Sequence, residues 1–144
     1  MPLPYKVMAN PKRVILIIDD DRNVCELIKL RLEAENDYQV FIACDGISGM
    51  KNVLGLVPEC ILLDIRMQIG DGLSVLRQVR SYRNDDLELQ ERIRSIPVVI
   101  LTGVGNEMES FFKVEGANDY IEKPFDSSQL KKCLQRVFEG QSRF

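Results

Sequence analysis

The sequence predicts one α/β domain over residues 13–140, a doubly wound five-stranded parallel sheet with helices on both faces. Three short apolar runs support this prediction: Val14–Ile18, Cys60–Leu63 and Val98–Leu101. Each run is continuous rather than alternating, as in strands that are covered on both faces. Strand-like and helix-like segments alternate five times, and the right-handed crossover rule then gives an open parallel sheet with helices on both of its faces.

The first helix and the second strand follow the first run. Apolar residues recur at helical spacing at Val24, Leu27, Ile28 and Leu32, which predicts one buried helix face. Tyr38–Ile42 is a more mixed apolar run, as suits a strand near the edge of the sheet.

The second helix is predicted around residues 47–57. Ile47, Met50, Leu54 and Val57 fall on one face of a helix, and we expect that face to pack on the sheet.

The connection before the fourth strand is unusual in length. Ser81–Ser95 is highly charged and longer than the roughly two to six residues of a typical connection. We expect it to extend the third helix or to form an extra helical turn.

The last strand and helix complete the alternation. Asp119–Ile121 is a short strand-like run, Asp126 is placed to cap the last helix, and Gly140 is placed to end it. One face of that helix is apolar: Leu130, Cys133, Leu134, Val137 and Phe138. Residues 1–12 are interpreted as a loose N-terminal arm and residues 141–144 as a C-terminal tail.

Composition restricts the classes of function. With 144 residues, 45% hydrophobic and 28% charged, the chain suffices for one ordinary core. Its net charge of -3 and interspersed signs argue against direct nucleic-acid or membrane binding. It has neither a run of about 20 apolar residues nor the hydrophobic region of a signal peptide. Four scattered cysteines suit reduced thiols. We therefore expect a cytoplasmic protein.

Histidine is absent from the chain. This removes the commonest general base and the commonest transition-metal ligand. Any chemistry must use carboxylates, hydroxyls and lysine.

Polar residues directly follow four of the predicted strands, and the carboxyl ends of these strands form the ligand-binding edge of an open α/β sheet. They are Asp19, Asp20, Asp21, Asp64, Thr102 and Lys123. Clustered carboxylates favour a hard divalent cation such as Mg²⁺. Phosphoryl transfer needs a nucleophile, for which Asp64 is placed, and positive charge near the phosphoryl oxygens. Each residue alone also suits a helix cap or a solvated turn; their joint occurrence favours the chemical interpretation.

These segments carry a close family resemblance. The runs are ILIIDDD at 15–21, ILLDIRM at 61–67, DG at 71–72, PVVILTG at 97–103 and GANDYIEKPF at 116–125. Over about residues 13–138 the chain resembles the receiver domains of two-component response regulators, in particular the chemotaxis regulators. The resemblance implies the flavodoxin-like strand order 2-1-3-4-5, which the handedness rule alone does not give.

The resemblance also implies roles for individual residues. Asp64 would be the phosphoacceptor, and Asp19, Asp20, Asp64 and the backbone carbonyl of Arg66 would bind Mg²⁺, for which Mn²⁺ can substitute. The remaining roles are phosphoryl binding by Thr102, Gly103 and Lys123, a conformational switch through Thr102 and Tyr120, and a cis peptide at Lys123-Pro124. From the residues alone, Tyr120 is equally well an edge-strand aromatic packed on the last helix.

Partners follow from the same resemblance. A sensor histidine kinase or a histidine phosphotransfer protein would supply the phosphoryl group. A downstream protein, or a second copy of the chain, would bind the Met108–Phe112 helix with the neighbouring strand and helix. The chain would not be an enzyme beyond its own phosphorylation and dephosphorylation.

Some positions depart from the family pattern. Gln68 stands where the family usually has proline, and the stretch between Thr102 and Gly116 is about one residue short, so loop geometry can differ. Arg66 and Val104 occupy positions that tune the lifetime of the phosphoryl group in the family.

Two other classes were compared with this interpretation. Asp19 and Asp21 match the D-x-D spacing of haloacid-dehalogenase-like phosphatases, although Arg22 and Asn23 fit that motif poorly. A flavin carrier would need a loop rich in Ser, Thr and Gly where DDDRN stands, and a degenerate receiver would lack a key residue. Whether the chain acts alone or is one domain of a larger protein stays open.

Overall fold

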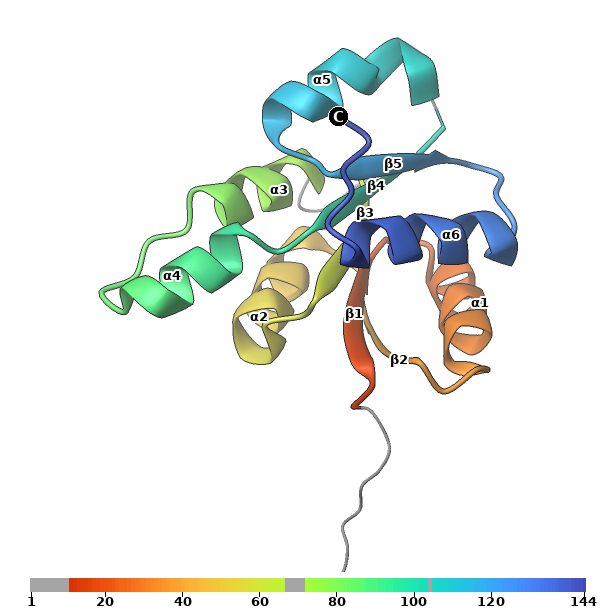
Figure 1. Cartoon of the computed structure of the whole chain (residues 1–144), viewed down its shortest axis with the longest axis horizontal. Helices are drawn as coiled ribbons and strands as arrows, with labels where there is room; N and C mark the ends of the chain where they lie inside the picture. The colour runs from red at the N-terminus through yellow and green to blue at the C-terminus, as the bar shows by residue number, and fades with distance from the viewer. Residues whose placement is uncertain (1–10, 67–71, 104) are drawn as a thin grey trace, which may run out of the picture.

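A computed structural model describes residues 11–66, 72–103 and 105–144, in which helices and strands alternate as predicted (Figure 1). The strands are β1 (Arg13–Ile18), β2 (Tyr38–Ala43), β3 (Cys60–Asp64), β4 (Val98–Thr102) and β5 (Asp119–Glu122). The helices are α1 (Arg22–Glu33), α2 (Gly46–Leu56), α3 (Gly72–Arg80), α4 (Leu87–Arg94), the 3-10 helix η1 (Gly105–Met108), α5 (Glu109–Glu115) and α6 (Ser127–Phe138).

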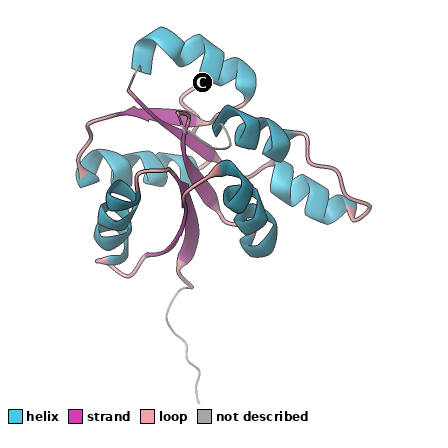
Figure 2. Cartoon of the chain, turned by 180° about the vertical axis from the view of Figure 1, so that it is seen from behind, coloured by secondary structure: helices cyan, strands magenta, loops and turns pink. Residues whose placement is uncertain are grey.

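The described strands form one sheet in the order β2-β1-β3-β4-β5, and every neighbouring pair is parallel. This confirms the fold class and the strand order. Helices cover both faces, as the two opposite views show (Figures 1 and 2). Because connections lead from β1 and β3 in opposite directions along the sheet, the chain order reverses between these two strands. Their carboxyl ends are therefore the place where a ligand site is expected.

The core consists of two apolar layers, one on each face of the sheet. Alternate residues of each strand point to opposite faces, so that Leu16 and Ile18 join one layer while Ile15 and Ile17 join the other. The first layer packs against α2, α3, α4 and α5, and the second against α1 and α6. This double coverage explains why the central strands are continuously apolar.

The predicted inner face of α2 is wrong in part. Ile47 and Leu54 are exposed, whereas Met50 and Val57 pack against the core as predicted. The buried residues of this helix are Gly46, Gly49 and Val53. A Cβ atom at Gly49 would lie 2.8 Å from Cδ1 of Ile18, so the small residues let α2 approach β1 closely. Hydrophobicity alone does not report a face that packs through glycine.

The predicted inner face of α1 is wrong at one position. Leu27 is exposed. The buried residues of this helix are Cys25, Ile28 and Leu32.

The charged connection Ser81–Ser95 contains a separate helix and does not extend α3. Helix α3 ends at Arg80, and Asp86 caps α4 by accepting hydrogen bonds from the N–H groups of Glu88 and Leu89, each at 3.1 Å. The half-buried Arg80 guanidinium joins this region to the sheet. It donates to the carbonyls of Gly116, Arg94 and Ile96 and to Oδ1 of Asn118, at distances from 2.7 to 2.9 Å.

The last helix has the predicted ends. Asp126 and Gln129 form a capping box, in which the Asp126 carboxylate accepts the N–H of Gln129 at 2.8 Å. The helix ends at Phe138, and Gly140 adopts a positive φ of 77° that reverses the chain. The residues beyond return to β5 and pack there.

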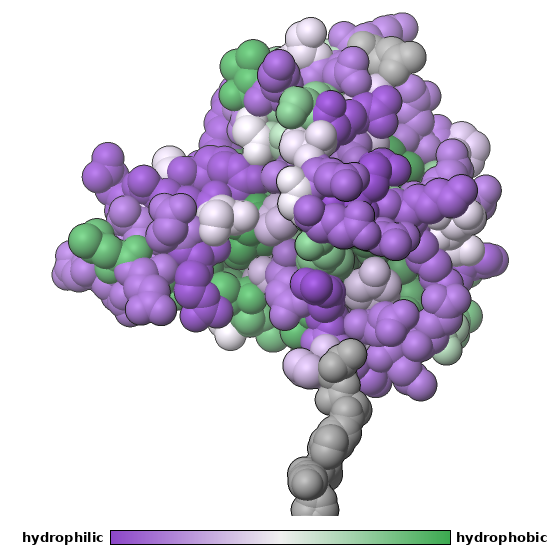
Figure 3. All heavy atoms as spheres, in the orientation of Figure 1, coloured by the Kyte–Doolittle hydropathy of each residue, from purple (hydrophilic) through white to green (hydrophobic). Residues whose placement is uncertain are grey.

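Most of the surface in the view of Figure 3 is hydrophilic. In the part of the chain that the structure describes, no helix combines the length and apolar character needed to cross a bilayer. All four cysteines are free, and Cys25, Cys60 and Cys133 are buried. Burial is the main reason that the pKa of the Cys25 thiol rises to about 12, which keeps this thiol protonated.

Candidate functional site

Three carboxylates gather at the carboxyl ends of β1 and β3. One oxygen from each of Asp19, Asp20 and Asp64 lies within 4.8 Å of the others. Asp19 and Asp64 are buried, whereas Asp20 is exposed. Hard oxygen donors at this spacing suit a small divalent cation such as Mg²⁺. The residues present therefore fit a Mg²⁺ ion.

Asp21 does not belong to this group, although it is the third acid of the run. It is the N-cap of α1, and its Oδ1 accepts the N–H of Val24 at 3.2 Å. The capping interpretation of acidic residues after a strand thus holds for Asp21.

Asp19 is the most enclosed of the three carboxylates. Its Oδ1 accepts a hydrogen bond from the N–H of Asp21 at 2.9 Å, and its Oδ2 accepts one from Nζ of Lys123 at 3.1 Å. Both oxygens therefore have partners from the protein.

Asp64 stands at the last position of β3, where its Oδ1 accepts the N–H of Arg66 at 3.0 Å. Its Oδ2 lies 3.7 Å from Lys123 Nζ, beyond hydrogen-bond distance. Burial is the largest cause that raises the pKa of Asp64 to about 6, the hydrogen bond from Arg66 opposes the rise, and the charge of Asp19 adds to it.

Gly72 fixes the backbone below this carboxylate. It is the first residue of α3, and a Cβ atom there would collide with the carbonyl oxygen of Asp64 and the Cα of Ile65. The close approach of α3 to the end of β3 requires glycine. In the sequence, Gly72 stands out only as part of the DG pair of the family pattern, which does not reveal this packing role.

Lys123 brings the positive charge. Its backbone N–H donates to the carbonyl of Thr102 at 2.7 Å, which holds the ends of β4 and β5 together, and the Lys123-Pro124 peptide bond is cis. Burial alone would lower the pKa of Lys123, but the hydrogen bond to Asp19 and the charges of Asp19 and Asp64 outweigh it and raise the pKa. The ammonium group stays charged between the two carboxylates.

Thr102 and Tyr120 lie on neighbouring strands. In the β4–β5 register, Ile100 is opposite Tyr120 and Thr102 is opposite Glu122. Thr102 therefore shares a sheet face with Ile100, and Ile100 and Tyr120 belong to the same core layer. Both Thr102 and Tyr120 are buried.

The helical segment at Met108–Phe112 differs from the expectation. It is divided between η1, which ends at Met108, and α5, which begins at Glu109. Phe112 is a core residue at 1% exposure, so it offers no surface to a partner. The apolar side chains of α5 that reach solvent are Phe111, at 36% exposure, and Val114, at 83% exposure.

Several residues of the family pattern fall outside the described ranges. These are Met67, Gln68, Asp71 and Val104. Gly103, for which a phosphoryl-binding role was expected, is described and exposed at the end of β4.

The composition of the described site favours one kind of chemistry. It combines the buried carboxylate of Asp64, a lysine within 4 Å of it and a set of oxygen ligands for a cation. Such a site suits attack by Asp64 on an electrophile that carries several negatively charged oxygens.

The comparison with protein families gives a match over most of the chain. The family described as "Response regulator receiver domain" matches residues 15–135. The DNA-binding dual master transcriptional regulator RpaA of Synechocystis is 36% identical over 117 residues, which are 81% of this chain and 45% of RpaA. The response regulator ArlR of Staphylococcus saprophyticus is 34% identical over 128 residues, 88% of this chain and 53% of ArlR. The chain thus spans about half the length of these relatives.

Solved structures with a similar fold include chemotaxis proteins. The chemotaxis response regulator CheY4 of Vibrio cholerae has a TM-score of 0.76 and 25% identity, and the match covers 88% of this chain and 99% of CheY4. The receiver domain of the sensor histidine kinase PA1611 from Pseudomonas aeruginosa has a TM-score of 0.73 and 28% identity over 88% of this chain and 97% of that domain. Its structure holds a magnesium ion coordinated in the active site cleft.

Proposed function

The chain belongs to the response regulator receiver domain family, and from this premise we propose that it is a phosphorylation switch in which Asp64 accepts a phosphoryl group and thereby alters a protein-binding surface. The observation that supports Asp64 as the phosphoacceptor most directly is how its carboxylate is bonded compared with that of Asp19. It is buried, and its Oδ2 lies beyond hydrogen-bond distance of Lys123, while both oxygens of Asp19 are engaged. A phosphatase mechanism based on Asp19 and Asp21 would lack its second acid, because Asp21 caps α1.

In the proposed reaction, Oδ2 of Asp64 attacks the phosphorus atom of the donor. A new P–O bond forms as the bond from phosphorus to the leaving atom breaks, and the leaving group departs with the electron pair. With a histidine kinase or a histidine phosphotransfer protein as the donor, the leaving atom is an imidazole nitrogen, which keeps the electron pair of the P–N bond and takes any proton it needs from water.

Other residues would prepare the site for this step. Asp19, Asp20, Asp64 and the carbonyl of Arg66 would hold Mg²⁺, or Mn²⁺ in its place, and the ion would supply positive charge for the phosphoryl oxygens. Lys123 would pair with one phosphoryl oxygen, and the Thr102 hydroxyl and the Gly103 N–H would donate to others. The cis bond at Pro124 directly follows Lys123 in the chain.

The conformational change would pass from Thr102 to Tyr120. Because both side chains belong to the same face of the sheet on neighbouring strands, a movement of the Thr102 hydroxyl toward the phosphoryl group would leave space that the Tyr120 ring can enter. Such a movement would change the surface of α5, β5 and α6. We propose that this surface, with the exposed Phe111 and Val114, binds a downstream protein or a second copy of the chain.

The proposed location is the cytoplasm, where kinases of this type act on receivers and where the free state of all four cysteines is favoured. DNA binding is in the name of one relative, of which the chain matches 45%. We propose that this chain makes no direct contact with nucleic acid, because its net charge is -3 and the phosphate backbone attracts positively charged surfaces.

The experiment that tests the phosphoacceptor uses acetyl phosphate and intact-mass spectrometry. We expect the mass of one phosphoryl group to be added in Mg²⁺, and no addition to Asp64→Ala or in excess chelator. Lys123→Met should slow the reaction at least about tenfold, in line with the loss of one electrostatic donor. Lys131→Met, which removes a lysine that pairs with Glu35 at the surface, is the matched control. Equal phosphorylation of Asp64→Ala and wild type would contradict the proposal.

A further inference from the structure

Residues 141–144, which the sequence predicts to be a C-terminal tail, return to β5 and form a strap there. The chain reverses at Gly140, and the N–H of Gln141 donates to the carbonyl of Arg136 at 2.9 Å. Asn118, just before β5, then receives two bonds on its carbonyl oxygen, one from the N–H of Arg143 and one from Oγ of Ser142, each at 3.0 Å. The backbone of Arg143 and the side chain of Ser142 therefore anchor the strap next to the start of β5.

The Arg143 guanidinium lies on Tyr120. Its central carbon is 4.2 Å from the ring centroid, which is a cation–π arrangement, and Nη2 donates to the Tyr120 hydroxyl at 3.1 Å. Nε donates to Glu109 at 3.0 Å, and Nη1 is 3.6 Å from the carboxylate of Asp119. One side chain thus joins the start of α5, the start of β5 and the aromatic ring.

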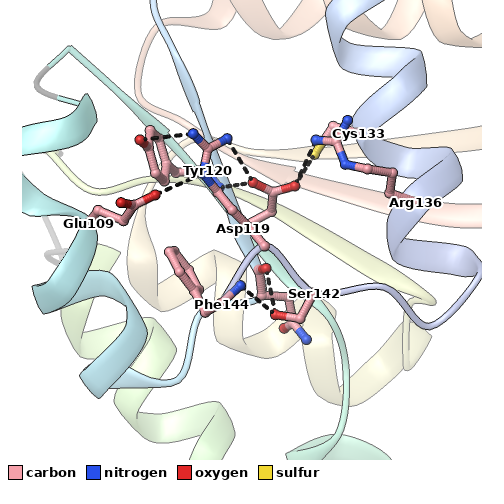
Figure 4. A network of polar contacts seen from close by, with 9 residues as sticks. Glu109, Asp119, Tyr120, Cys133, Arg136, Ser142 and Phe144 are labelled. Carbon is pink, nitrogen blue, oxygen red and sulfur yellow. Dashed lines mark hydrogen bonds and ion pairs between the residues drawn. The ribbon is translucent and has the colours of Figure 1, made fainter.

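Phe144 encloses the same ring. It stacks on Tyr120 with the ring centroids 6.3 Å apart and the ring planes at 20° to each other. The ring centroid of Phe112, a core residue, lies 5.7 Å from that of Tyr120. Tyr120 is left with 4% exposure. Figure 4 shows the resulting network, in which Tyr120, Asp119 and Phe144 come together from β5 and the strap.

The buried carboxylate of Asp119 attracts the positively charged Arg143 side chain to this site. Asp119 has 0% exposure, and its charge is compensated by Arg136 at 2.9 Å and by Arg143. Its Oδ2 also accepts a bond from the Cys133 thiol at 3.4 Å. Asp119, Glu109 and Tyr120 together therefore form a binding site that suits an arginine side chain. The ring of Phe112 lies next to Tyr120 and adds an apolar surface that suits an aromatic residue.

From these contacts we propose that the strap of residues 141–144 is an intramolecular ligand of the Tyr120 face that holds the switch in its resting position. The inference rests on the proposed function, because it concerns the ring whose movement would report phosphorylation. If Tyr120 moves inward, it must leave the Arg143 hydrogen bond, the cation–π contact and the Phe144 stack. Strap binding and phosphoryl binding are therefore negatively coupled, and the coupling is reciprocal.

The test is a beryllofluoride titration in the presence of Mg²⁺, followed by amide chemical shifts in the full chain. Beryllofluoride mimics the phosphoryl group at an aspartate. We expect Arg143→Gln to bind it about threefold to tenfold more tightly than wild type, the effect of removing one cation–π contact and one hydrogen bond. Phe144→Ala should shift the affinity in the same direction. At saturation of the wild type, the Phe144 amide should move toward its position in Arg143→Gln.

Arg13→Gln is the matched control. Arg13 lies over the Phe138 ring at the same 4.2 Å and pairs with Glu59 at 3.7 Å, at the opposite end of the sheet strands from Asp64. Its replacement should leave the affinity unchanged. Unaltered affinity in both Arg143→Gln and Phe144→Ala, or an unmoved Phe144 amide at saturation, would overturn the strap alone. If the Arg66 amide of the wild type, which lies next to Asp64, shows no chemical-shift change during the titration, the proposed function is overturned together with the coupling.

Discussion

The carboxyl group of Asp64 is adapted to two opposite demands. In the proposed reaction it must be ionised to act as a nucleophile, yet it sits at the buried end of β3 beside Asp19, and burial raises its pKa from the ordinary 3.8 to about 6. The N–H of Arg66 and the ammonium of Lys123 limit the rise. The carboxylate is consequently ionised at neutral pH but poorly solvated, a state in which an added cation relieves an unfavourable charge.

This residue should make the metal-free protein less stable as the pH rises. Between about pH 4 and pH 6 the native state keeps a proton on Asp64 that the unfolded state has released, so the free energy of unfolding falls over this range and levels off above it. In chelator, Asp64→Asn should equal wild type near pH 4 and be more stable at pH 7 by about 1–3 kcal/mol. Urea denaturation across this pH range measures the difference.

The control for this prediction is Asp45→Asn. The hydrogen bond from the N–H of Ser48 lowers the pKa of Asp45, which is the opposite direction. Its contribution to stability is therefore present at neutral pH and lost in acid, so the variant should never exceed wild type at pH 7. If Asp64→Asn is no more stable than wild type at pH 7 in chelator, the assigned environment of Asp64 is wrong.

Among the elements, α3 sets the position of the site because it starts directly against the end of β3. Gly72→Ala should cost about 2–4 kcal/mol, since the new methyl group meets backbone atoms that have no other place to go. Gly55→Ala, in α2, adds a methyl group with nothing within 4 Å and should stabilise by about 0.5–1 kcal/mol. Thermal or urea denaturation compares the two. Similar stabilities for both variants would refute the close packing of α3 on β3.

The extra helix α4 depends on one arginine of α3. Arg80 satisfies three backbone carbonyls and the side chain of Asn118. A lysine cannot reproduce this fork of donors, so Arg80→Lys should lower the free energy of unfolding by about 2–4 kcal/mol.

Arg77→Lys is the control for Arg80→Lys. Arg77 pairs with Glu115 through two hydrogen bonds at 2.8 and 2.9 Å, but it is largely exposed. Its replacement should cost about 1 kcal/mol or less. Equal decreases in the free energy of unfolding of the two variants would show that the buried contacts of Arg80 stabilise the fold no more than the exposed pair of Arg77 does.

At the scale of the whole molecule, the sheet was accessible from the sequence. Continuous apolar runs are a direct consequence of burial on both faces, so β1, β3 and β4 were predicted to within one residue at each end. The gathering of Asp19, Asp20, Asp64 and Lys123 followed from the rule that parallel strands end at one edge. The strand order came from the family resemblance, since handedness alone allows others.

What the sequence did not reveal depends on contacts between segments that are far apart. The inner face of α2 packs through Gly49, and a glycine carries no hydrophobic signal. The strap depends on Arg143 meeting Asp119 and Tyr120, residues that are separated by about twenty positions and are ordinary in composition. The burial of Phe112 beside the exposed Phe111 is likewise set by how α5 lies on the sheet.

The whole account depends on which aspartate carries the phosphoryl group. The most direct measurement is to phosphorylate the wild-type chain with acetyl phosphate and Mg²⁺, reduce the acyl phosphate with borohydride, and locate the product by peptide mass spectrometry. Borohydride converts a phosphorylated aspartate to homoserine, so the modified position is recorded covalently. We predict homoserine at position 64 and unmodified aspartate at positions 19, 20 and 21. Homoserine at position 19 with an intact Asp64 would contradict the account and restore the phosphatase interpretation.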